Sequence, residues 1–293
     1  MATGSEPPNV VASIPPVHSL VAKVTEGVTV AHLIVPPGAS PHGFALRPSD
    51  AVALADADLV VWIGPELESF LANDLDDLAP HARSLALLHD AGLETLPIRS
   101  GGAWPADHDA AGDGDDAAGG ADPHVWLDPV NAVAMVTAIA DALGAIDPDH
   151  AAAYSANAAS AEADLRALDQ RVRAALEPVR GRPFVVFHDA YQYLERRYGL
   201  NGVGALAIHP ELSPSARDMV ELRARLRALG QVCVFREPQF SDANVASVVE
   251  GTDAVIGTLD PVGAFAPGVA LFDRLVEGIG AAFVDCLARL PAS

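Results

Sequence analysis

Short apolar runs recur along the chain and alternate with longer segments in which apolar residues are spaced three and four apart. Short runs bounded by turn residues are typical of buried strands, and the wider spacing is typical of amphipathic helices. Strands that alternate with helices predict mostly parallel sheets. The predicted strands lie at residues 9–13, 28–35, 58–63, 84–88, 183–188, 231–235 and 253–259. Because the first four runs stand well apart from the last three, we expect an α/β protein with two Rossmann-like lobes.

The strongest helical pattern lies between these two groups of strands. Apolar residues recur at intervals of four and three across residues 154–179, with Asp147 suited to cap the helix and Pro148 to begin it. A helix that continues to about residue 178 would be about 45 Å long and rigid. The predicted organisation is an N-terminal lobe at 1–146, a linking backbone helix at 147–180 and a C-terminal lobe at 181–293.

Composition restricts the partners of such a protein. The 293 residues include 39 acidic and 18 basic ones, and the formal net charge is -21. A surplus of this size repels nucleic acids and anionic membranes, so it favours a cationic ligand. No stretch approaches the roughly 20 uninterrupted apolar residues of a membrane helix. The start of the chain, Met1 to Glu6, resembles no signal peptide, so we expect a cytoplasmic protein or a mature exported form.

The most acidic segment is the loop at 101–121, which consists largely of Gly, Ala and Asp. It offers too little apolar surface to offset the entropy of ordering, so we expect it to be flexible. His108 lies between Asp107 and Asp109 and could form a weak secondary metal-binding set. The alternative is a solvated linker whose exact sequence hardly matters.

Three of the ten histidines differ from the others in position. His42 follows a predicted strand, His124 follows the acidic loop, and His188 ends a predicted strand. Asp260 follows another strand. Ligands of open α/β sheets bind beyond the carboxyl ends of the strands, where these residues lie. Three imidazoles and one carboxylate suit tetrahedral zinc, although scattered structural histidines remain the alternative at this point.

The two cysteines lie in different predicted elements. Cys233 is in a strand and Cys286 is in the last amphipathic helix. A disulfide would form in an oxidising compartment, and two buried free thiols are the alternative. Spacing along the sequence does not decide between them, because it does not fix the distance between Cα atoms.

Four segments carry a family resemblance, namely "SPHGFALRPSD", "DPHVWLDP", "FHDAYQYLERRYGL" and "GTLDPVG". In their content and order they resemble the metal-specific solute-binding proteins of bacterial ABC importers. The resemblance implies two α/β lobes joined by one long helix, and a periplasmic receptor that delivers a divalent metal to an ABC permease. It places His42, His124 and His188 at the metal-binding histidines, and Asp260 at the acidic residue of the site.

Within that family, this chain resembles the zinc-uptake branch more than it resembles the manganese and iron receptors. Manganese and iron receptors typically carry Glu where this chain has His188, since harder ions prefer oxygen ligands. The zinc branch often joins two cysteines, which implies a bridge between Cys233 and Cys286. Its flexible loop is usually rich in histidine, whereas the loop here has only His108. The resemblance therefore implies a monomeric Zn²⁺ receptor, with a periplasmic zinc metallochaperone as a further partner, and a manganese or iron receptor is the runner-up.

A metal-dependent hydrolase is the alternative from another class. A His-His-His-Asp site with an exchangeable water could activate hydrolysis. The sequence has no HExxH helix and no nucleophile elbow, so we expect no enzyme. Asp189 is better suited to orient a ligand or to cap a helix. Water, or another carboxylate such as Glu237, is the alternative to Asp260 as the fourth ligand.

Overall fold

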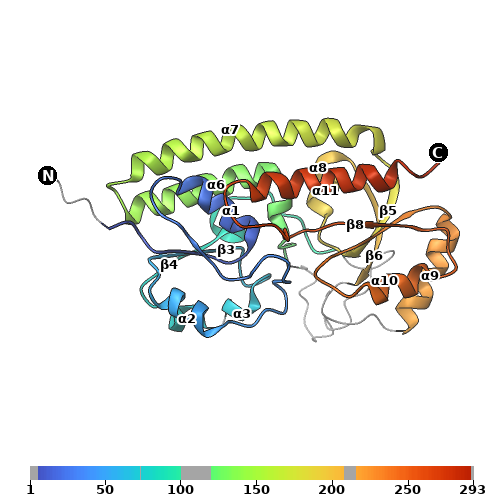
Figure 1. Cartoon of the computed structure of the whole chain (residues 1–293), viewed down its shortest axis with the longest axis horizontal. Helices are drawn as coiled ribbons and strands as arrows, with labels where there is room; N and C mark the ends of the chain where they lie inside the picture. The colour runs from blue at the N-terminus through green and yellow to red at the C-terminus, as the bar shows by residue number, and fades with distance from the viewer. Residues whose placement is uncertain (1–5, 73, 100–119, 208–215, 292–293) are drawn as a thin grey trace. The chain divides into compact units, whose positions relative to one another are not determined.

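The computed structural model describes residues 6–72, 74–99, 120–207 and 216–291 (Figure 1). Most of the acidic loop, including Asp107, His108 and Asp109, lies outside the described residues.

The chain divides into two units, each with one parallel four-stranded sheet. The first unit comprises Met1–Thr95, Pro123–Gln170 and Val262–Val276, and the second comprises Leu96–Asp122, Arg171–Pro261 and Glu277–Ser293. The prediction of two α/β lobes with parallel sheets is confirmed. The lobe boundaries inferred from the sequence stay predictions.

The sheet of the first unit has the order β2-β1-β3-β4. Its strands are β1 (Val10–Ala12), β2 (His32–Leu33), β3 (Leu59–Trp62) and β4 (Arg83–Ala86). Both central strands are buried along their whole length, which explains their uninterrupted apolar sequence. In Figure 1, α1 (Pro15–Val24) and α6 (Pro129–Ile146) lie on one side of this sheet, and α2 (Pro48–Ala55) and α3 (Ser69–Ala72) lie on the other. The unit also contains the short helices α4 (Leu75–Leu78) and α5 (Leu87–Asp90).

By length and composition alone, helix α6 is long enough and apolar enough to cross a membrane. Its buried side chains include Met135, Val136, Ile139 and Leu143, and the helix contacts α1 and β3. Asp128 caps its first turn by accepting a hydrogen bond from the Val130 amide at 2.8 Å. A helix of this composition that packs against a sheet is typical of a protein core.

The sheet of the second unit has the order β6-β5-β7-β8. Its strands are β5 (Pro183–His188), β6 (Asn201–Ala207), β7 (Cys233–Arg236) and β8 (Val255–Thr258). Successive residues of β5 face opposite sides. Phe184 packs against Phe283 of α11 (Leu271–Leu287), with ring centroids 4.8 Å apart. Val185 and Phe187 pack in one core cluster with residues of α9 (Ala216–Leu229) and α10 (Asp242–Val249). Because both faces of β5 are covered, its sequence is apolar at every position before His188.

The predicted long helix is confirmed as α7 (Ala151–Leu176), which begins in the first unit, ends in the second and is followed by a 3₁₀ turn at Glu177–Val179. It begins later than predicted, because Asp147 ends α6 instead of capping α7. The Asp147 carboxylate accepts hydrogen bonds from His150 Nδ1 at 2.8 Å and from the Tyr154 hydroxyl at 2.7 Å.

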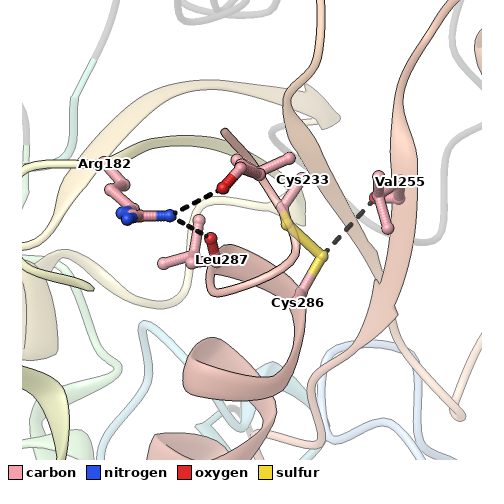
Figure 2. The surroundings of a disulfide bond; sticks show 6 residues. Arg182, Cys233, Val255, Cys286 and Leu287 are labelled. Atoms are coloured by element: carbon pink, nitrogen blue, oxygen red, sulfur yellow. Dashed lines mark hydrogen bonds between the residues drawn. A yellow bond between two sulfur atoms is a disulfide. The ribbon is translucent and has the colours of Figure 1, made fainter. Parts of the chain in front are cut away.

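Cys233 and Cys286 form a disulfide between β7 and α11, with Cα atoms 6.1 Å apart (Figure 2). The end of α11 is further held by Arg182, whose Nη1 donates to the carbonyls of Leu287 at 2.7 Å and Leu290 at 3.1 Å. Leu287 is the last residue of α11 and Leu290 lies beyond it, so the two bonds fix the chain where the helix ends. Cys286 Sγ lies 3.7 Å from the Val255 carbonyl oxygen. Since a bridged sulfur has no proton to donate, this is a packing contact.

Candidate metal centre

The first unit brings two of the predicted ligands together. The Nε2 atoms of His42 and His124 are 3.3 Å apart. Two nitrogens bound to one tetrahedral zinc at the usual bond length lie about 3.3 Å apart, so this spacing already suits a shared ion. In neutral rings one Nε2 donates and the other accepts the hydrogen bond between them. A dication would take the place of that proton.

His42 lies in the loop between β2 and α2. The loop leaves the sheet in register, because the amides of Ile34 and Val35 donate to the carbonyls of Ala12 and Ser13 in and just beyond β1. Gly38 then turns the chain with φ 82°, a backbone conformation that favours glycine. The His42 amide is 3.3 Å from Ser40 Oγ, which accepts its hydrogen bond.

His124 lies at the start of a short 3₁₀ turn, Val125–Leu127, whose three side chains are buried. Its own side chain is only 5 % exposed, and its ring centroid is 5.3 Å from that of Trp126. This packing fixes the position from which Nε2 reaches His42.

In the second unit, His188 is the last residue of β5 and is 3 % exposed. Its Nδ1 is 2.8 Å from Glu237 Oε1, and the hydroxyl of Tyr191 donates to the same oxygen at 3.2 Å. Because an ionised carboxylate only accepts hydrogen bonds, Nδ1 carries the proton and Nε2 keeps a lone pair for a metal. Burial by itself lowers the pKa of His188, but the charge and hydrogen bond of Glu237, with Asp189 and Asp122, outweigh it and raise the pKa.

Asp260 follows β8 and is half-buried. Its carboxylate accepts a hydrogen bond from Gln239 Nε2 at 2.7 Å. For Asp189, the sequence favours a role in orienting a ligand or capping a helix. The helix-cap alternative is wrong, because its carboxylate pairs with Arg99, whose Nε is 2.8 Å from Oδ2, and α8 (Gln192–Tyr198) has no side-chain cap.

Three other histidines have structural partners. Nε2 of His18 is 3.1 Å from the Ala31 carbonyl, and burial lowers the His18 pKa. His150 pairs with Asp147, and Nε2 of His89 is 3.0 Å from Glu66. None of these three contacts involves His42, His124 or His188.

Sequence reasoning missed the orienting contact between Glu237 and His188. Glu237 directly follows β7, so its position at a strand end was a usable signal, but the identity of its partner depends on the pairing of β5 with β7. It also missed the contacts that Arg47 makes at the base of the His42 loop.

Comparisons with known proteins identify the family of this chain. The family model described as "Zinc-uptake complex component A periplasmic" matches residues 10–279. The high-affinity zinc uptake system protein ZnuA of Brucella suis is 40% identical over 306 residues, covering 96% of this chain and 92% of that protein. The ZnuA protein of Paracoccus denitrificans is 36% identical, covering 97% of this chain and 93% of that protein.

Solved structures share the fold. A crystal structure of ZnuA has a TM-score of 0.80 at 24% identity, covering 96% of this chain and 99% of that one. The periplasmic zinc-binding protein TroA from Treponema pallidum has a TM-score of 0.80 at 23% identity, with the same coverage. The family match and the identity to the Brucella protein together show that this chain belongs to the ZnuA family, the periplasmic component A of zinc-uptake complexes.

Proposed function

We propose that the protein is a periplasmic receptor that captures Zn²⁺ and delivers it to the permease of an ABC importer. Family membership and the names of the relatives support the transport role. The observation that carries the metal-binding role is the 3.3 Å separation of His42 Nε2 and His124 Nε2, which suits a common zinc ion.

We further propose that His188 of the second unit is the third ligand. Its Nδ1 is engaged by Glu237, so Nε2 is the nitrogen left for the metal. A third imidazole in place of a carboxylate favours zinc over harder ions such as manganese.

Asp260 is the proposed fourth contributor. Three neutral imidazoles leave the two positive charges of the ion uncompensated, and a carboxylate reduces that cost. The hydrogen bond from Gln239 orients the Asp260 carboxylate. Glu237 is better suited to hold His188, because its Oε1 already accepts from His188 Nδ1 and from the Tyr191 hydroxyl.

The proposal also covers the oligomeric state and a second partner of the receptor. The receptor acts as a monomer, and a periplasmic zinc metallochaperone is a further partner. His108 with Asp107 and Asp109 forms a weak secondary set of metal ligands. The chain has 39 acidic and 18 basic residues, and this excess of negative charge supports attraction of a cation.

Single substitutions of the histidines test the site. Replacing His42, His124 or His188 by Ala should weaken Zn²⁺ binding by more than about 100-fold, as measured by competition with a chelator. Loss of a residue that only holds a metal ligand typically costs about 10- to 100-fold, and loss of a ligand should cost more. His18→Ala and His150→Ala are matched controls and should retain the affinity of the parent protein. Equal losses in all five variants would overturn the site, and tighter binding of Mn²⁺ than of Zn²⁺ would overturn the choice of metal.

A further inference from the structure

The loop that carries His42 is closed at its base by a side chain. Arg47 Nη2 donates a hydrogen bond at 3.0 Å to the carbonyl oxygen of Ile34, 13 residues earlier in the chain. Ile34 lies just beyond β2, and Arg47 immediately precedes α2. This bond therefore joins the two ends of the segment in which His42 lies.

A buried carboxylate holds Arg47 in this position. Asp50 Oδ2 accepts from Arg47 Nε at 2.9 Å and from the Arg47 amide at 2.9 Å, and Oδ1 accepts from Nη2 at 2.9 Å. Asp50 is 0 % exposed, whereas the Arg47 side chain is half exposed. The carboxylate is thus the fixed member of the pair, and its two oxygens match the planar fork of the guanidinium.

Two further features anchor Asp50. It lies in the first turn of α2, where a negative charge is favoured by the helix dipole. Its Oδ1 is also 3.4 Å from Nε2 of His32 in β2. Burial by itself raises the Asp50 pKa, but the hydrogen bonds from Arg47 and His32 outweigh burial and lower it, so the carboxylate is ionised at neutral pH.

We propose that Arg47 and Asp50 are positioning residues for zinc capture. They fix both ends of the His42 loop and so keep His42 Nε2 at the spacing from His124 that suits a shared ion. Neither residue is among the proposed metal ligands. This inference rests on the proposed zinc site, and it adds residues that act on the site through the loop.

The physical reason is preorganisation. A ligand on an unfixed loop must be ordered when the ion binds, and that entropy is subtracted from the binding free energy. A fork held by a buried carboxylate orders the loop before the ion arrives. Lysine retains the charge of arginine but cannot donate in the same bidentate geometry, so Arg47→Lys isolates the contribution of the fork.

The first test measures Zn²⁺ affinity of full-length Arg47→Lys and Asp50→Asn, with circular dichroism to show that each is folded. The expected result is binding about 10- to 100-fold weaker than in the parent protein, as for other outer partners of metal ligands. Arg182→Lys is a matched control, because Arg182 also donates to main-chain carbonyls but in the second unit. It should lower the melting temperature and leave Zn²⁺ affinity unchanged.

The second test combines Arg47→Lys with His42→Ala. If Arg47 acts through His42, its substitution should cost no further affinity once His42 is absent. An equal loss in both backgrounds would mean a general effect on the fold and would overturn the inference. Parent-like affinity of both Arg47→Lys and Asp50→Asn would overturn it as well. Unchanged affinity in His42→Ala would instead overturn the proposed zinc site itself, so the two failures are distinguishable.

Discussion

Nδ1 of His188 lies 2.8 Å from the carboxylate of Glu237, and both residues are almost completely buried. The pair joins the end of β5 to the residue that follows β7. A buried imidazole with an ionised partner on one nitrogen has a fixed tautomer and a fixed ring orientation. If His188 is the third zinc ligand, as proposed, the nitrogen that it offers to the ion is set by a residue that does not itself need to touch the ion.

Glu237→Gln should weaken Zn²⁺ binding by about 10- to 100-fold, because the neutral amide no longer supports the basicity and the tautomer of His188. Calorimetric titration with Zn²⁺ measures the change. Glu277→Gln is the matched control, since Glu277 pairs with Arg171 in a largely exposed position. Parent-like affinity in Glu237→Gln would contradict the orienting role.

Zn²⁺ affinity should fall as the pH is lowered, because a proton competes with the ion for each imidazole. The pKa of His188 is raised above its ordinary value of 6.5, so its contribution is complete above the raised pKa and is lost as the pH falls through it. Titrations between pH 8 and pH 5 should show the decline beginning above about pH 6.5. A flat profile would count against a histidine site.

Removing the disulfide should destabilise the protein but leave it able to fold. The bridge spans 53 residues of sequence. Its loss should lower the free energy of unfolding by about 4 kcal/mol in the chain-entropy model, because the denatured chain regains conformational entropy. Urea unfolding of the double variant Cys233→Ala/Cys286→Ala measures this difference. Two titratable thiols in the unfolded, unreduced parent protein would show that the bridge does not form.

The pH dependence of the stability of the metal-free protein should depend on Glu68. Burial raises the pKa of Glu68 from 4.5 to about 7, although Ser13 Oγ and the amides of Ile63 and Gly64 donate to its carboxylate. Between these two pH values the folded state binds more protons than the unfolded state. The contribution of protonated Glu68 to the free energy of unfolding is therefore complete below pH 4.5 and is lost as the pH rises through about 7. The free energy of unfolding should fall less over this window in Glu68→Gln than in the parent protein. Identical pH dependence in the two proteins would contradict this assignment.

The acidic loop should affect the rate of zinc capture more than its equilibrium. Five aspartates lie in residues 104–119, and carboxylates near a metal site accelerate encounter with a dication, an effect that salt screens. Deletion of residues 104–119, or replacement of the five aspartates by Asn at constant length, should slow zinc association and reduce its salt dependence. Unchanged rates in both variants would leave the loop as a spacer, and loss of tight binding on deletion would show that the site is misplaced.

The sequence by itself determined the features that depend on local pattern. Uninterrupted apolar runs such as residues 183–187 predicted buried strands, and the intervals of four and three predicted α7. Strand ends are visible for the same reason, and they made His188 and Asp260 candidate ligands, while His42 and His124 were chosen from their loops. Scattered structural histidines remained the alternative on that pattern alone. A resemblance in motif order then added the metal and the transport role.

Only the tertiary structure decided which distant residues meet. The pairing of β5 with β7 brings Glu237 to His188, and the packing of α11 brings Cys286 to Cys233. Arg47 reaches Ile34 because the loop returns to the end of β2. The sequence suits Asp147 to the start of α7, but its amide donates to the Leu143 carbonyl and so ends α6, while its carboxylate accepts from His150 and Tyr154 on the α7 side. Such contacts depend on strand register and side-chain packing, which residues close in sequence do not specify.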